Sequence, residues 1–115
     1  MEFDKTLLAG STGLMLLKLL SEQDMYGYQM IDELRRRSDH TFDLKAGTLY
    51  PLLHTLEQKG FIAAYESAAA GRVRRVYRLT DSGKKRLAEK ESEWNAYTAA
   101  VAKVLKGGAC FGWNV

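Results

Sequence analysis

The sequence predicts a mainly α-helical fold with one small β-hairpin, on three observations. Apolar side chains recur at helical spacing in four segments, at about residues 4–20, 25–37, 46–60 and 80–106. Two short strand-like runs around a turn of small residues separate the third segment from the fourth. The 115 residues are 46% apolar and 27% charged, which is typical of one globular domain.

The first helix is expected to run from Asp4 to Leu20, with Asp4 as its N-cap. The second is expected from Met25 to Arg37, where apolar residues again lie on one face. The run Arg35–Arg37 falls at its C-terminal end, where the helix dipole favours cations. We interpret this run as a solvated helix end.

The third helix should start near Ala46–Thr48 and end at Gly60, a residue type that commonly terminates helices. Leucines form one face, whereas the opposite face is small or polar: Gly47, Thr48, Tyr50, Pro51, His54, Thr55 and Gln58. Strands are expected at Phe61–Tyr65 and Val73–Leu79, joined by a turn at Ser67–Gly71. Since its leucine face is expected to pack inward, the polar face of the third helix is free to meet a partner.

Thr80 is the expected N-cap of a last helix that runs to about Lys106. Leu87, Trp94 and Val101 repeat every seven residues, and Tyr97 and Val104 repeat likewise. This spacing is typical of a partial coiled-coil seam, which Lys90 interrupts.

The net charge of +3 is unevenly distributed along the chain. Residues 1–44 hold five basic and eight acidic side chains, residues 45–90 hold ten and four, and residues 91–115 hold two and two. A concentrated basic segment in the middle of the chain indicates a polyanionic partner more strongly than the modest total does.

Three helices, a hairpin and a long terminal helix are the order of elements of a winged helix-turn-helix. The third helix of that architecture enters the DNA major groove, and the hairpin is the wing. Residues 71–78 carry four arginines and no acid, as phosphate contact requires. We therefore expect a DNA-binding domain at residues 1–80, a dimerisation helix at 81–106 and a tail at 107–115.

Several motifs are similar to those of the PadR family of bacterial transcriptional regulators. They are the runs Met25–Ile31, Gly47–Leu53, Leu56–Ile62 and Gly71–Gly83, in register over roughly residues 7–105. The single short C-terminal helix resembles the small PadR subfamily, whose members dimerise through that helix. The resemblance implies a homodimeric repressor that binds double-stranded DNA at an inverted-repeat operator, and some members respond to phenolic or planar aromatic compounds.

The candidate DNA-binding residues lie on the second and third helices and on the wing: Tyr26, Lys45, Gly47, Thr48, Tyr50, His54, Arg72, Arg74 and Arg75. For Tyr50, packing of the ring into the protein is the alternative to DNA contact. Tyr28 is expected to pack between helices, and for Arg78 pairing with an acid is the alternative to DNA contact.

The candidate residues for the dimer interface are Leu87, Trp94, Tyr97 and Val101. Two facing Trp94 indoles could sandwich a flat aromatic effector. The alternative is that Trp94 and Tyr97 only anchor the dimer core.

Other functions find little support in the sequence. His40, His54 and Cys110 have no recognised metal-ligand spacing, and we expect no metal and no cofactor. No nucleophile–base pair indicates an enzyme. The alternative function is a winged-helix module for protein contacts without an effector, which an acidic or apolar third-helix face would support. With one cysteine and no leader-like or membrane-spanning run, a cytoplasmic location is expected.

Overall fold

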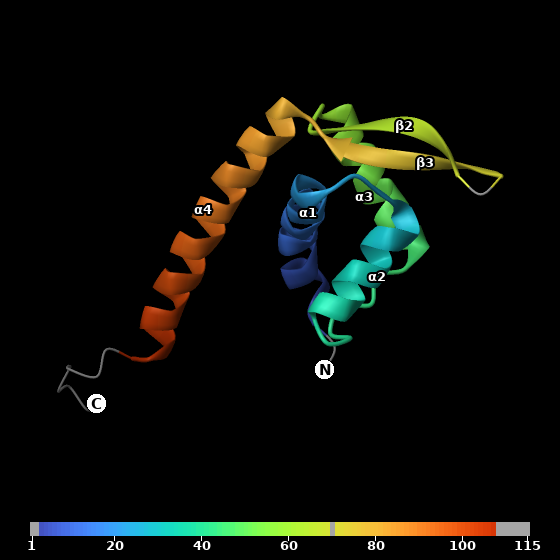
Figure 1. Ribbon diagram of the computed structural model, residues 1–115. Helices are drawn as coiled ribbons and strands as arrows, with labels where there is room; N and C mark the ends of the chain where they lie inside the picture. The colour runs from blue at the N-terminus through green and yellow to red at the C-terminus, as the bar shows by residue number, and fades with distance from the viewer. Residues whose placement is uncertain (1–2, 70, 108–115) are drawn as a thin grey trace.

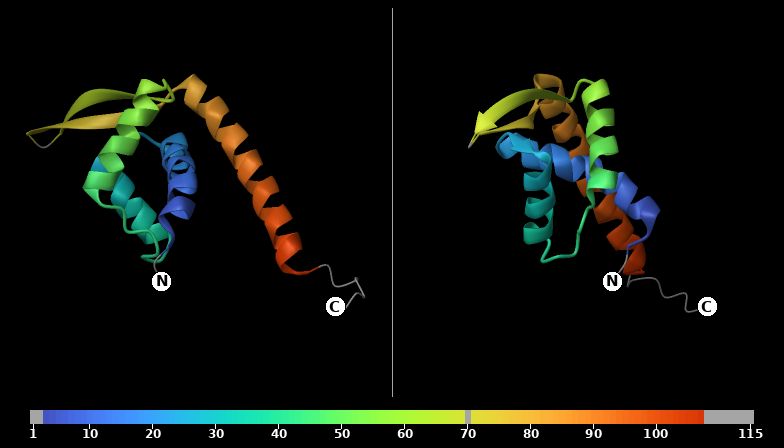
Figure 2. Two further views of the ribbon diagram at one scale, coloured as in Figure 1. Left: turned by 180° about the vertical axis from the view of Figure 1, so that it is seen from behind. Right: turned by 90° about the vertical axis from the view of Figure 1, so that its right-hand side faces the viewer.

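The computed structural model describes residues 3–69 and 71–107. The elements in that part of the chain are α1 (Lys5–Glu22), β1 (Met25–Tyr26), α2 (Gly27–Arg37), α3 (Ala46–Gln58), β2 (Ile62–Ala69), β3 (Arg72–Leu79) and α4 (Asp81–Leu105). The strands form one antiparallel sheet in the order β1-β3-β2. Figures 1 and 2 show α1, α2 and α3 gathered beside this sheet, with the β2–β3 hairpin projecting as a wing. The predicted mainly α-helical winged-helix fold is confirmed.

The helix ends follow local hydrogen bonding. The Asp4 side chain accepts a hydrogen bond from the Thr6 N–H at 2.9 Å, so the predicted N-cap of α1 is confirmed. Helix α1 continues to Glu22, two residues beyond the expected end. At the end of α3, Gly60 adopts a φ of +80°, which glycine tolerates best.

The expected start of the second helix at Met25 is wrong. Met25 and Tyr26 are extended and pair with Tyr77 and Val76 of β3, so α2 begins at Gly27. The Tyr26 N–H, left without a helical partner, donates to Oε1 of Gln29 at 2.9 Å. The beginning of α2 is thereby attached to the middle strand of the sheet.

The wing is longer than expected. Strand β2 extends to Ala69, so the predicted turn at Ser67–Gly71 is mostly strand, and the reversal is completed at Gly71 with a φ of +76°. Eight cross-strand pairs, from Ile62–Leu79 to Ala69–Arg72, set the register. This register places Arg72, Arg74 and Arg75 in the half of the hairpin next to its turn.

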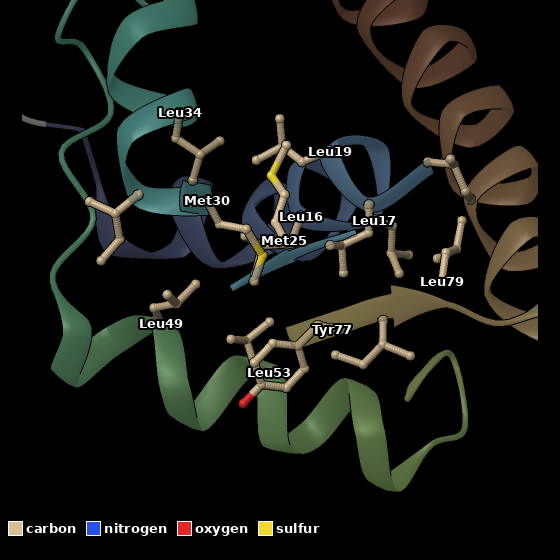
Figure 3. Packing of buried hydrophobic residues seen from close by; sticks show 14 residues of the cluster. Leu16, Leu17, Leu19, Met25, Met30, Leu34, Leu49, Leu53, Tyr77 and Leu79 are labelled. Carbon is tan, nitrogen blue, oxygen red and sulfur yellow. The ribbon is translucent and has the colours of Figure 1, made fainter. Parts of the chain in front are cut away.

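The core lies where α1, α2 and α3 meet the sheet (Figure 3). Leu16, Met30, Leu49 and Leu53 have no exposed surface, and Tyr77 reaches in from β3. Because one face of α3 supplies Leu49 and Leu53 to this core, the opposite face is directed to solvent.

Helix α4 is joined to the end of α3 by hydrogen bonds at Thr80. The Thr80 hydroxyl donates to the Gly60 carbonyl at 2.6 Å and accepts from the Gly83 N–H at 3.0 Å, which confirms the predicted N-cap. A side chain at Gly83 would collide with the Phe61 carbonyl, so this close approach requires glycine. Beyond this joint α4 runs diagonally away from α2 and α3 (Figure 1).

The run Arg35–Arg37 is neutralised by carboxylates of its own chain. Arg36 and Arg37 each contact Glu33 at 2.8 Å, Arg37 also pairs with Glu22, and Arg35 pairs with Asp43 at 2.9 Å. Hydrogen bonds from Arg36 and Arg37 lower the pKa of Glu33 to about 2. Arg37 therefore links the end of α2 to the end of α1, Arg35 links it to the following loop, and the run is not a free cationic patch.

Within the described residues, none of the helices combines the length and apolarity that crossing a bilayer demands.

The Glu33 interactions predict an acid-dependent loss of stability. Because folding lowers the pKa of Glu33 from 4.5 to about 2, its stabilising contribution is complete above about pH 4.5 and is lost as the pH falls toward 2. Urea unfolding at several pH values should show Glu33→Gln less stable than the wild type at pH 7, with a difference that narrows as the pH falls from about 4.5 through 2. Glu89→Gln is the matched control, since its cation, Arg86, lies 3.9 Å away. A constant difference between wild type and Glu33→Gln across this range would contradict the assignment.

Candidate nucleic-acid interface

The outward face of α3 carries the predicted recognition residues. Gly47, Thr48, Tyr50 and His54 are all exposed, and the intervening Leu49 is fully buried. A side chain at Gly47 would meet nothing within 4 Å, so the helix is open to a partner there. Lys45, at the N-cap, is exposed but pairs with Asp43 at 3.0 Å. The face is small, polar and free of acidic residues at these positions, unlike the acidic or apolar face that a protein-binding module would favour.

Tyr50 combines the two orientations considered for it. Its ring packs against Gly27 so closely that a side chain at Gly27 would overlap the hydroxyl. The ring is nevertheless 41% exposed, and partial burial raises the pKa of its hydroxyl. Tyr50 thus braces α3 against the start of α2 and still presents its edge to solvent.

The expectation that Tyr28 packs between helices is wrong, because Tyr28 is 62% exposed. It follows the N-cap of α2 by two residues, on the turn that faces away from the core. The buried positions of α2 are Gly27, Met30, Ile31 and Leu34, a stripe that leaves Tyr28 outside. Its phenol is therefore available beside Tyr26.

The wing separates its arginines onto two faces. Side chains alternate along a strand, so Arg72, Arg74 and Arg78 share one face of β3, and Arg75 shares the other with the buried Tyr77 and Leu79. On this second face Arg75 Nη2 lies 2.9 Å from Oε2 and 3.2 Å from Oε1 of Glu57 on α3. Pairing with an acid was the alternative for Arg78; in the described part of the chain the wing arginine that pairs with an acid is Arg75.

A groove of about 490 Å³ brings the predicted residues of α2, α3 and the wing together. It is lined by Tyr26, Gly27, Tyr28, Tyr50 and residues 72–75. The Arg74 guanidinium lies 4.4 Å from the centre of the Tyr26 ring, a cation–π distance that orients both groups. Hydroxyl and guanidinium donors at one groove match the oxygens of a phosphate backbone.

Farther away, α4 carries an apolar stripe that the described part of the chain covers only in part. Trp94, Tyr97, Val101 and Val104, which we call the pairing surface, follow one another at intervals of three or four residues. They are 38%, 65%, 37% and 77% exposed. Leu87 does not belong with them, because it is only 7% exposed and packs in the core of its own chain. We therefore remove Leu87 from the expected dimer interface.

Trp94 and Tyr97 also line a groove of about 560 Å³ between α1 and α4. Leu7 and Leu14 of α1 form its apolar wall, and Lys90 and Glu93, which pair at 3.4 Å, stand at its edge. Lys90, the residue that interrupts the predicted seam, thus has a partner on its own helix.

In the described ranges, no group of three His, Cys, Asp or Glu residues is arranged to hold a metal ion. The prediction of a tail at 107–115 falls almost entirely outside the described residues, as does Cys110.

Sequence reasoning missed Glu57 and the exposure of Tyr28. Nothing in the spacing of Glu57 and Arg75, eighteen residues apart on different elements, indicates their contact. The alternation within β3 was the one available signal, since it places Arg75 on the face of Tyr77.

Comparisons with known proteins agree with this geometry. The model of the Transcriptional regulator PadR-like family matches residues 16–89. An uncharacterized protein of Lysinibacillus sphaericus is 36% identical over 102 residues, which cover 88% of this chain and 94% of the relative. A transcriptional regulator of Mycobacterium tuberculosis is 38% identical over 69 residues, which cover 60% of this chain and 62% of the relative.

Solved structures are similar over most of their length. A transcriptional regulator from Clostridium thermocellum has 30% identity and a TM-score of 0.80, with 86% of this chain and 97% of that chain covered. A PadR family transcriptional regulator from Eggerthella lenta has 33% identity and a TM-score of 0.77, with 90% and 88% covered. Since the family model spans more than half of the sequence, the chain belongs to the PadR-like family of transcriptional regulators and is a regulator rather than an enzyme.

Proposed function

We propose that this chain is a dimeric repressor that binds double-stranded DNA at an inverted-repeat operator. The observation that carries the proposal is the exposed face of α3, whose nearby acid Glu57 is paired with Arg75, beside a groove lined by Arg72, Arg74 and Arg75. Neither Arg72 nor Arg74 has an ion pair within the described residues, so both are available to phosphates. In a dimer, two such faces would meet half-sites about 34 Å apart, one helical turn of DNA.

The contacts divide by chemistry into base reading and backbone positioning. Thr48 and His54 carry donors and acceptors on the outer face of α3, where base edges would lie. Gly47 leaves room for close approach of α3 to the DNA, and Lys45, although paired with Asp43, is exposed at the start of α3 and would reach a phosphate there. Tyr26, Tyr50, Arg72 and Arg74 would take the flanking phosphates from the groove.

The same proposal assigns residues 1–80 to DNA binding and 81–106 to dimerisation. The pairing surface on α4 supports the second assignment, because its four side chains follow the three- and four-residue spacing of a coiled-coil seam. The adjoining α1–α4 groove has an apolar wall of Leu7 and Leu14 that could receive side chains of a second copy. A second copy of this chain is therefore the occupant that we propose for this surface.

We further propose that a planar aromatic or phenolic effector binds at this interface and releases the DNA. Trp94 supports the proposal, because it is partly exposed on the pairing surface and its indole can stack on a flat ring. Such stacking contributes about 0.5–1.5 kcal/mol beyond burial. Release would require the effector to bind one arrangement of the two recognition helices more tightly than the other. Since its proposed ligand is chromosomal DNA, we place the protein in the cytoplasm.

The DNA proposal predicts that DNA affinity falls steeply with salt and that only certain substitutions change the slope. Binding should be measured by fluorescence anisotropy on DNA from upstream of its own gene across a salt series, with footprinting to locate the site. Arg72→Ala should reduce the slope of log affinity against log salt by about 0.9 for each phosphate that the variant no longer neutralises. Arg36→Ala is the control, because Arg36 is paired with Glu33 at the far end of α2. Thr48→Ala and His54→Ala should instead change which DNA sequences are preferred. Binding to DNA that is insensitive to salt would refute the proposal.

The dimer proposal predicts that the same charge disrupts the dimer at one position of α4 and leaves it intact at a nearby position. Val101→Arg places a charge in the pairing surface and should convert the dimer to a monomer in sedimentation experiments. Ala99→Arg adds the same charge two residues earlier, on the opposite side of a helix with coiled-coil spacing, and should leave the dimer intact. Equal behaviour of the two variants would place the interface elsewhere.

The effector proposal predicts tryptophan quenching that depends on Trp94. Titration with a phenolic acid and with a planar polycyclic dye should quench the fluorescence of the wild type. In Trp94→Phe the second tryptophan, Trp113, still fluoresces and serves as the internal reference. Quenching of equal depth and midpoint in this variant would show that the aromatic site lies elsewhere.

A further inference from the structure

We propose that Glu57 and Arg75 form a strut that fixes the wing relative to the recognition helix, and that Arg75 acts by positioning and not by touching DNA. The inference rests on the proposed DNA-binding function and refines it. It assigns the four arginines of the wing to two roles that their sequence does not distinguish.

The direction of the Arg75 side chain is the first support. It lies on the face of β3 that includes Tyr77 and Leu79, both buried in the core, and therefore points toward the helical body. Arg72 and Arg74 point to the opposite face. Arg75 also lines the edge of the groove beside Tyr50, but its guanidinium is held there by Glu57 of α3.

The contact with Glu57 is the second support. One Arg75 nitrogen donates to both carboxylate oxygens, at 2.9 and 3.2 Å, and the guanidinium lies 5.7 Å from the Tyr77 ring centre. Glu66 is the cross-strand neighbour of Arg75, so a second carboxylate occupies the same face. The hydrogen bond to Glu57 is also the main cause of the raised pKa of Arg75. The ion pair with Glu57 offsets the Arg75 charge, which leaves less positive potential there for a phosphate.

The position of Glu57 means that the pair ties the hairpin to the end of α3. Glu57 lies on the last turn of α3, whose buried leucines anchor that helix in the core. Arg75 lies four residues from the wing's turn at Gly71. The pair consequently restrains the free part of the hairpin at a point beyond its last buried residue, Tyr77. Breaking the pair should loosen the wing without removing a group that binds DNA.

A charge-neutral double variant tests this directly in the full-length protein. Glu57→Gln with Arg75→Met breaks the pair, keeps both side chains at similar length and leaves the net charge unchanged. Arg72→Ala is the reference for a true phosphate contact, and the exchanged pair Glu57→Arg with Arg75→Glu is the rescue. The probe is a labelled duplex of arbitrary sequence and about 30 base pairs, long enough for two half-sites one turn apart. Affinity is measured across a salt series, and amide hydrogen exchange is measured on the wing without DNA.

The expected result is a parallel shift. The double variant should bind about twofold to fivefold more weakly at every salt concentration, the range of an exposed ion pair, with an unchanged slope. Its wing amides should exchange faster by a similar factor, and the exchanged pair should restore both readouts. Arg72→Ala should instead reduce the slope by about 0.9 for each phosphate left without its cation, with unchanged exchange.

Two outcomes would overturn the strut. A slope reduced as much as in Arg72→Ala would make Arg75 a phosphate ligand, and unchanged wing exchange would remove its positioning role. If the wild type itself shows no salt-dependent binding, the proposed function fails, whereas the exchange measurements still decide whether Glu57 holds the wing.

Discussion

The arrangement of the whole DNA-binding face depends on the pairing of β3 with strands on both of its sides. β1 attaches the start of α2 to one edge of β3, and β2 completes the wing on the other. Tyr77 and Leu79 at the end of the same strand enter the core, and Thr80 follows at once as the cap of α4. One strand therefore relates the three surfaces that matter here: the groove beside α2, the wing and the pairing helix.

Much of the fold follows from periodicity and turn chemistry. The leucine stripe of α3, the caps at Asp4 and Thr80 and the left-handed Gly60 are local signals, and the structure agrees with each. The two-residue strand β1 could not be predicted this way. Its residues continue the helical pattern of α2, and only hydrogen bonds to a strand some fifty residues later in the chain make them extended. The same limit explains Leu87, whose seven-residue spacing from Trp94 fits a seam, although the core of its own chain buries it.

The candidate site was predicted best where exposure follows from burial on the opposite face, as for Gly47, Thr48 and His54. It was predicted least well for arginines, since their role depends on which carboxylates fold next to them. The run Arg35–Arg37 and the wing look alike as sequence, yet the first is saturated by Glu22, Glu33 and Asp43. Within the wing, the register of β3 separates Arg75 from Arg72 and Arg74. Arginine content therefore indicates a polyanion partner only after intramolecular pairing has been subtracted.

The joint at Thr80 has a mechanical consequence. The hydroxyl of Thr80 bonds the chain just after α3, its backbone N–H donates to the Phe61 carbonyl at 3.1 Å, and Gly83 packs against the same carbonyl. Only Thr80 separates β3 from α4, so no flexible loop lies between the pairing surface on α4 and the joint with α3. Helix α4 has 25 residues, and its N-terminal end is fixed to the residues that follow α3. Any rotation of α4 about this joint would therefore change the angle between α4 and α3.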